Sequence, residues 1–126
     1  MSSTGKKILI VDDDPRNIFA MRATLRSRSY NCISCEDGAT ALKIIETDEK
    51  IDLVLLDMMM PDMDGYEVLS RLRRLELPRA IPVIAVTAQA MPGDREKCLK
   101  AGADDYVSKP VDVDRLFSLL EKYCHA

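Results

Sequence analysis

Continuous apolar runs alternate along this chain with segments in which apolar residues recur at helical spacing. The runs at residues 7–11, 52–56 and 82–86 are uninterrupted and partly β-branched, which is typical of strands buried on both faces of a parallel sheet. Shorter and weaker runs at residues 32–34 and 105–108 fit strands at the sheet edges. The pattern therefore predicts five strands.

The segments between and after these strands predict five helices. Asp14 followed by Pro15 is typical of a helix N-cap with proline at the first helical position. The apolar positions at helical spacing are Ile18, Met21 and Leu25; Ala41, Ile44 and Ile45; Val68, Leu72 and Leu75; Cys98 and Leu99; and Val113, Leu116, Phe117, Leu120 and Cys124. Five strands alternating with five helices predict a doubly wound α/β fold, in which helices cover both faces of a parallel sheet.

Composition is that of one ordinary globular domain. Of the 126 residues, 47% are hydrophobic and 31% are charged, so we expect a single domain over residues 1–126 with an ordered core at about 6–124. The net charge of −3 is a poor match for phosphate backbones, so no direct nucleic-acid partner is expected. No apolar run approaches the roughly 20 residues that span a bilayer. Residues 1–7 lack the apolar stretch of a secretory signal, and we expect a cytoplasmic location.

The cysteines are interpreted as small, mostly buried apolar residues. Cys32 and Cys35 form a C-x-x-C pair, for which zinc or redox chemistry is the alternative. Residues three apart on a strand point to opposite faces, which would separate these two thiols. The single histidine, His125, lies at the end of the chain, so a hydrolase built on a histidine base is not expected.

Chemically active residues follow four of the predicted strands: Asp12 and Asp13 the first, Asp57 the third, Thr87 the fourth and Lys109 the fifth. Because doubly wound folds bind ligands outside the carboxyl ends of their strands, these side chains should converge on one rim. Clustered carboxylates repel one another unless a cation intervenes, and Mg²⁺, with Mn²⁺ as the alternative, prefers oxygen ligands. A lysine and a hydroxyl beside such an ion suit phosphoryl transfer, in which a carboxylate can act as the nucleophile.

The chain resembles the receiver domain of two-component response regulators over essentially its whole length. The matching blocks are ILIVDD at 8–13, LDMMMPDMDG at 56–65, AVTA at 85–88 and AGADDYVSKP at 101–110. This resemblance implies a flavodoxin-like sheet with strand order 2-1-3-4-5. The segment at 87–102 is most similar to receivers of hybrid histidine kinases and phosphorelays.

The resemblance also implies roles for the acidic residues. Asp57 is expected to be the phosphoacceptor, and Asp13, Asp57 and the backbone carbonyl of Met59 are expected to bind Mg²⁺ directly. Asp12 is expected to bind the ion through water. Side chains two residues after Asp57 and after Thr87, which are Met59 and Gln89 here, are expected to shape the access of water. Asp14 is interpreted as a helix cap rather than a ligand.

Further implied roles fall at the ends of the last two strands. Lys109 is expected to pair with one phosphoryl oxygen and Thr87 to hydrogen-bond to another, while Tyr106 matches the aromatic switch position. The Lys109–Pro110 bond is expected to be cis. The fourth helix, fifth strand and fifth helix are expected to form the surface that senses a downstream protein.

These expectations describe a signalling phosphoacceptor that phosphorylates and dephosphorylates itself, rather than an enzyme acting on small substrates. Its partner would be a sensor histidine kinase or a histidine phosphotransfer protein. One alternative is an aspartate-nucleophile phosphohydrolase, but such enzymes commonly carry a second aspartate where this chain has Met59. The other is a degenerate receiver that serves only for docking, but such receivers normally lose one of the acidic, Thr or Lys positions. The sequence leaves open whether the domain is free-standing or part of a longer protein.

Overall fold

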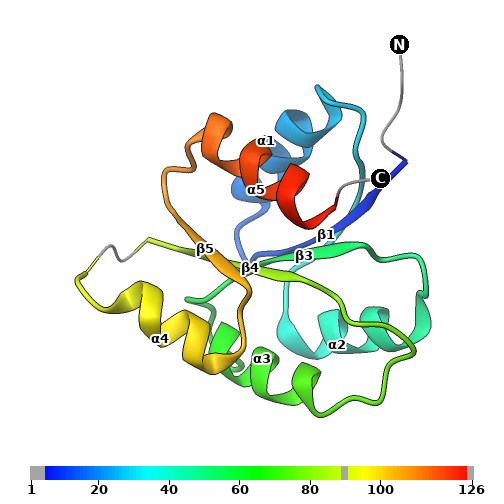
Figure 1. Ribbon diagram of the computed structural model, residues 1–126, viewed down its shortest axis with the longest axis vertical. Coiled ribbons are helices and arrows are strands. Elements are labelled where there is room, and N and C mark those ends of the chain that lie inside the picture. Colours follow the sequence, from blue (N-terminus) through cyan, green and yellow to red (C-terminus); the bar gives the residue numbers. More distant parts are fainter. Residues whose placement is uncertain (1–4, 89–90, 125–126) are drawn as a thin grey trace.

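The computed structural model describes residues 5–88 and 91–124, in which strands and helices alternate strictly (Figure 1). The strands are β1 (Lys7–Val11), β2 (Asn31–Cys35), β3 (Leu53–Asp57), β4 (Val83–Thr87) and β5 (Asp105–Ser108). The helices are α1 (Pro15–Arg26), α2 (Gly38–Thr47), α3 (Gly65–Arg73), α4 (Asp94–Ala101) and α5 (Val113–Tyr123). All ten predicted elements are present.

The strands form one parallel sheet in the order β2-β1-β3-β4-β5, which confirms the doubly wound fold and the order implied by the family resemblance. The predicted strands at 52–56 and 82–86 are displaced by one residue. Asp57 and Thr87 are the last residues of β3 and β4 rather than the first residues after them. Hydrogen bonding to the neighbouring strands extends the ladder onto these polar residues, so that Asp57 pairs with Val86 and Thr87 pairs with Ser108.

Successive residues of the central strands point into two separate cores, one on each face of the sheet. Leu9 and Val11 point toward α2, α3 and α4, whereas Ile8 and Ile10 point toward α1 and α5. Figure 1 shows the same division, with α1 and α5 on one side of the sheet and the other three helices on the opposite side. Burial on both faces is the physical reason that these strands are continuous apolar runs.

The thiols of Cys32 and Cys35 pack into opposite cores, as the strand geometry predicted. All four cysteines are free, and Cys35, Cys98 and Cys124 are buried. In α5 the helical pattern was partly wrong. Val113 is 45% exposed and borders a cavity, whereas Leu119, which the pattern omitted, is buried.

The helix α4 is the shortest of the five, and like α1 it has a single fully buried residue. Cys98 is the only residue of α4 that is fully buried, and its Sγ lies 3.8 Å from the hydroxyl of Tyr66 in α3. The helix begins after Gly93, which supplies no side-chain cap, and ends at Gly102, whose φ of 117° favours glycine.

Arg73, at the end of α3, ties the C-terminal end of α4 to the rest of the fold. Its guanidinium donates to the carbonyl of Gly102 at 2.6 and 3.0 Å and to the carbonyl of Ile81 at 3.1 Å. It also pairs with Asp104 at 3.0 Å, and that carboxylate accepts the N–H of Val83 at 2.8 Å. These contacts lie at the amino ends of β4 and β5. Across residues 5–88 and 91–124, no helix combines the length and the apolar character that crossing a membrane requires.

Candidate functional site

Three carboxylates meet at the carboxyl ends of the central strands. Asp57 ends β3 and is 3% exposed, Asp12 follows β1 and is 6% exposed, and Asp13 is exposed beside it. One carboxylate oxygen of each residue lies within 4.8 Å of the others, close enough for all three to bind one cation. The three carboxylates therefore converge, as the strand ends predicted. Oxygen ligands at this spacing suit a hard divalent ion such as Mg²⁺.

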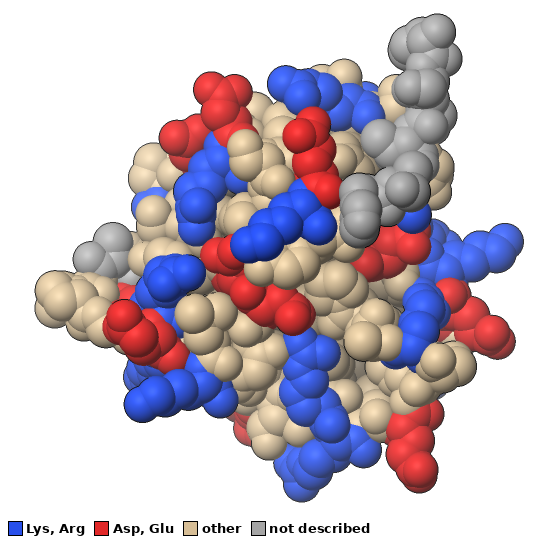
Figure 2. All heavy atoms as spheres, in the orientation of Figure 1, with Lys and Arg blue, Asp and Glu red and all other residues tan. Residues whose placement is uncertain are grey.

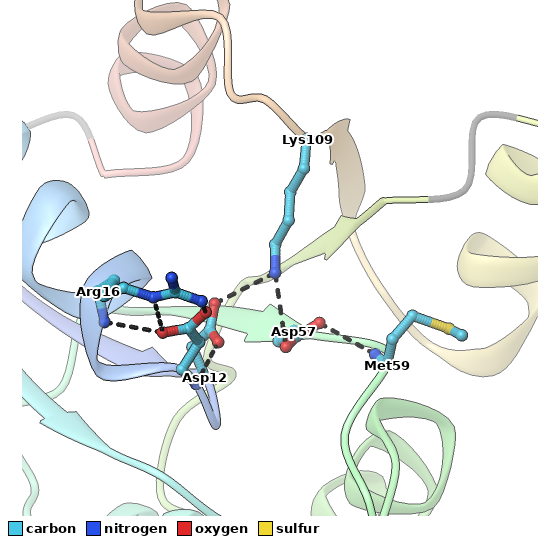
Figure 3. A network of polar contacts seen from close by, with 6 residues as sticks. Asp12, Arg16, Asp57, Met59 and Lys109 are labelled. Atoms are coloured by element: carbon cyan, nitrogen blue, oxygen red, sulfur yellow. Dashed lines mark hydrogen bonds and ion pairs between the residues drawn. The ribbon is translucent and has the colours of Figure 1, made fainter.

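Lys109 extends from the segment after β5 into the same cluster (Figure 3). Its Nζ lies 3.3 Å from Oδ2 of Asp12 and 3.5 Å from Oδ2 of Asp57. The other oxygen of Asp57, Oδ1, accepts the backbone N–H of Met59 at 3.0 Å. The Lys109–Pro110 peptide bond is cis, as the resemblance implied.

The environment of Asp57 raises its pKa above the ordinary carboxyl value. Burial is the largest cause, because it disfavours the charged form. The hydrogen bond from the Met59 N–H stabilises the anion and lowers the pKa. The negative charges of Asp12 and Asp13 raise the pKa, and the positive charge of Lys109 lowers it. A cation placed among the carboxylates would favour the ionised, nucleophilic form.

Asp14 lies apart from this cluster, in accordance with its interpretation as a helix cap. Its carboxylate accepts the backbone N–H of Arg16 at 2.9 Å and pairs with the Arg16 guanidinium at 3.0 Å. The Asp14 N–H in turn donates to Oδ1 of Asp12 at 2.9 Å, which orients the Asp12 carboxylate. Asp14 thus positions a site residue without joining the cluster.

The three consecutive methionines after Asp57 have different surroundings. Met58 is 1% exposed and Met60 is 7% exposed, so both belong to the core. Met59 is 50% exposed, and its thioether points away from Asp57 while its backbone lies at the site (Figure 3). Gly65 permits this tight loop, because a Cβ there would lie 2.7 Å from the Cα of Met58.

Thr87 and Tyr106 lie to the side of the carboxylates. Thr87 is 4% exposed at the end of β4, and its carbonyl accepts the N–H of Lys109 at 2.8 Å. Tyr106 is half-buried in β5 against the core that includes α4. Gln89, expected to shape the access of water, lies outside the described residues.

Two hollows flank the site, and sequence reasoning did not find either. A cavity of about 270 Å³ lies between α1 and α5, and Asp12, Asp57 and Lys109 form part of its wall. A second hollow, of about 420 Å³, includes Thr87, Met59, Tyr66 and Lys97 in its lining. The residues that line each hollow come from several elements far apart in the sequence, so no motif or spacing marks them.

The model of the response regulator receiver domain matches residues 8–121, and the chain therefore belongs to this family. The sensor histidine kinase RcsC of Salmonella typhi is 40% identical over 122 residues, which are 97% of this chain and 13% of RcsC. The signal transduction histidine-protein kinase BarA of Shigella flexneri is 38% identical over the same share of each chain. The chain thus spans about one-eighth of the length of these relatives.

Solved structures agree with the sequence relatives. The receiver domain of the sensor histidine kinase PA1611 from Pseudomonas aeruginosa, solved with a magnesium ion in its active site cleft, is 38% identical. It has a TM-score of 0.87 and covers 97% of this chain and 99% of its own. The receiver domain of Ssk1, solved with the histidine phosphotransfer protein Ypd1 of Saccharomyces cerevisiae, has a TM-score of 0.86 over 98% of this chain and 91% of its own. At 22% identity this second likeness concerns the fold alone.

Proposed function

We propose that Asp57 accepts a phosphoryl group from the phosphohistidine of a sensor kinase or phosphotransfer protein, in a reaction that requires Mg²⁺. The observation that supports this most directly is the placement of Asp57. It is a buried carboxylate within ion-pairing distance of Lys109 and within shared-ligand distance of Asp12 and Asp13. An isolated buried carboxylate would be costly, whereas a nucleophile needs this arrangement.

The acidic residues would divide the binding of Mg²⁺ among them. Asp13, Asp57 and the backbone carbonyl of Met59 would bind directly, and Asp12 would bind through water. When bound, the ion supplies positive charge that offsets the negative charge of the phosphoryl oxygens. The PA1611 receiver carries magnesium in its cleft, and the cluster of three carboxylates in this chain fits the same ion.

The transfer itself uses few protein groups. A carboxylate oxygen of Asp57 forms the new bond to phosphorus as the bond from phosphorus to the donor's imidazole nitrogen breaks, and the electron pair of that bond stays on the imidazole. Lys109 would hold one phosphoryl oxygen by charge, and the Thr87 hydroxyl would donate to another. The same groups would serve self-phosphorylation by small donors and, with water as the nucleophile, self-dephosphorylation.

Labelling with acetyl phosphate in the presence and absence of Mg²⁺ tests this proposal. We expect one phosphoryl group per chain, located at Asp57 by mass spectrometry, and no labelling of Asp57→Asn. Asp62→Asn is a matched control, because Asp62 is exposed and its positive φ of 65° is tolerated by asparagine. Phosphorylation at another residue, or labelling that persists in Asp57→Asn, would contradict the assignment. A docking module without phosphorylation, or a phosphatase that turns over small phosphoesters, would be distinguished by the same assay.

Phosphorylation would be sensed by a downstream protein through the surface formed by α4, β5 and α5, with Tyr106 in β5 between the two helices. Figure 2 shows positive and negative side chains interspersed over the face that carries these elements. A mixed surface suits a protein partner and offers no single-sign track for a nucleic-acid backbone. The four free thiols fit a reducing cytoplasmic setting, and residues 1–126 would act there as one receiver domain.

A further inference from the structure

The cavity between α1 and α5 is continuous with the phosphoacceptor site. Figure 1 shows the two helices beside each other on one face of the sheet. The cavity has a volume of about 270 Å³ and opens to solvent. The residues that line it are Ile10, Val11, Asp12, Asn17, Ala20, Met21, Thr24, Leu55, Asp57, Val86, Lys109, Pro110, Val111, Val113 and Leu116.

The lining is divided into a charged end and an apolar body. Asp12, Asp57 and Lys109 form the charged end, and most of the other lining residues are aliphatic. For comparison, an apolar cavity of about 150 Å³ in another protein is large enough to bind benzene. The α1–α5 cavity can therefore hold an aromatic ring together with the atoms that link it to a phosphoryl group at Asp57.

We propose that this cavity binds the apolar part of a small phosphodonor, so that the domain prefers aryl acyl phosphates, such as benzoyl phosphate, to acetyl phosphate. This inference rests on the proposed phosphorylation of Asp57. A carboxylate oxygen of Asp57 forms a bond to phosphorus, and the bond from phosphorus to the acyl oxygen breaks. The electron pair leaves with benzoate, and no proton is transferred.

The charges of the cavity suit this occupant at both stages of the reaction. Before transfer, the phosphoryl group lies at the end that Lys109 occupies, and the ring lies against Leu55, Val86 and Leu116. After transfer, the departing carboxylate forms next to the Lys109 ammonium, and the ring can leave through the opening. Lys109 already pairs with Asp12 and Asp57, so the phosphoryl end of this ligand would be held by Lys109 together with Mg²⁺, and its ring would occupy the aliphatic body of the cavity.

The experiment measures Mg²⁺-dependent labelling of the whole chain as a function of donor concentration. We expect the apparent KM for benzoyl phosphate to be roughly tenfold or more below that for acetyl phosphate, because burying a ring is typically a one- to two-decade effect on affinity. The comparison uses KM because the intrinsic reactivity of the two donors affects the maximal rate instead.

Two substitutions fill the cavity from opposite walls. Ala20→Phe in α1 and Val113→Phe in α5 should each raise the KM for benzoyl phosphate toward that for acetyl phosphate. Ala23→Phe is the matched control, because Ala23 is also an exposed alanine of α1 but does not line the cavity. This control should keep the wild-type preference, and all three variants should retain labelling by acetyl phosphate.

The possible results separate this inference from the proposed function. Equal KM values for the two donors in the wild-type protein would overturn the inference while leaving Asp57 as the phosphoacceptor. A preference for benzoyl phosphate that survives both cavity-filling substitutions would also overturn it, because the ring would then bind elsewhere. Failure of both donors to label Asp57 would instead refute the proposed function.

Discussion

At the scale of single residues, the site combines buried carboxylates with one positively charged side chain, that of Lys109. Lys109 lies 3.3 Å from Asp12 and 3.5 Å from Asp57, so one ammonium serves two carboxylates. Asp13 makes the local balance negative. This imbalance is the physical basis for metal binding, and it also implies that the empty site lowers the stability of the fold.

The effect of Asp57 on stability should depend on pH. Its pKa is raised in the folded chain, chiefly by burial, above the ordinary value of 3.8. Its favourable contribution is therefore complete below pH 3.8 and is lost as the pH rises through the raised value. At pH 7 without divalent ions, Asp57→Asn should raise Tm by a few degrees, since about 1 kcal/mol corresponds to roughly 3–5 °C in a domain of this size.

Thermal unfolding of both proteins between pH 3 and pH 8 checks this expectation. The gain from Asp57→Asn should shrink as the pH falls, and Asp62→Asn should show no comparable gain. A substituted protein less stable than wild type at pH 7 would mean that ionised Asp57 is stabilised by its neighbours rather than strained by burial.

Met59 should govern the lifetime of the aspartyl phosphate. Its side chain is half-exposed, two residues after Asp57, and has no group that orients an attacking water. Met59→Asn introduces such a group and should accelerate the loss of label severalfold in a pulse-chase measurement. Met58→Asn is unsuitable as a control because Met58 is buried, so Met91→Asn, at a residue 65% exposed, takes that place. Equal decay in the Met59 and Met91 variants would contradict the role of Met59.

Much of the site could be predicted from single residues because strand ends lie on one rim of a parallel sheet. Asp12, Asp13, Asp57 and Lys109 were found by this rule alone. The difference between Met58 and Met59 could not be predicted in the same way. It depends on the close approach of Gly65 to Met58, which are residues at the two ends of the loop after β3.

At the scale of elements, α4 is the shortest helix, with eight residues, and Cys98 is its one fully buried side chain. Few buried contacts imply a low free energy of local displacement. The short polar sequence of α4 indicated this property before its packing was known. The exposed position of Val113 in α5 could not be predicted from spacing, because helical periodicity does not show where a cavity interrupts the packing of a helix.

Phosphorylation should therefore displace α4 more than the other helices. Amide chemical shifts recorded with and without beryllofluoride, a phosphoryl mimic, should change from Asp57 through Thr87 to residues 91–108. Asp57→Asn should abolish these changes, because the mimic would lose its acceptor oxygen. Changes confined to the loops after β1 and β3 would contradict the displacement of α4.

At the scale of the whole molecule, the two cores and the central strands were predictable from continuous apolar runs. The order of the strands was not, because many orders satisfy the same alternation of strands and helices. That order came from the family resemblance, and the hydrogen-bonded pairs of β1 with both β2 and β3 confirm it.

Metal binding should stabilise the domain as a whole, because an ion that binds only the folded chain favours folding by mass action. Millimolar Mg²⁺ should raise Tm, and the rise should be much smaller for Asp13→Ala. Asp64→Ala offers no suitable control, since the Asp64 carboxylate caps α3 by accepting the N–H of Glu67. Asp62→Asn, at an exposed residue outside the cluster, serves better. Equal rises in the wild type and in Asp13→Ala would exclude Asp13 from metal binding.

The contacts of Arg73 make α4 a lever with one fixed end. The Arg73 guanidinium binds the carbonyl of Gly102 at the C-terminal end of α4. The N-terminal end of α4, after Gly93, has no side-chain cap. A force applied near Thr87 should therefore tilt the helix about Gly102, and the amplitude should grow toward its first turn. A protein bound to this first turn would therefore be displaced most, whereas a protein bound near Gly102 would be displaced very little.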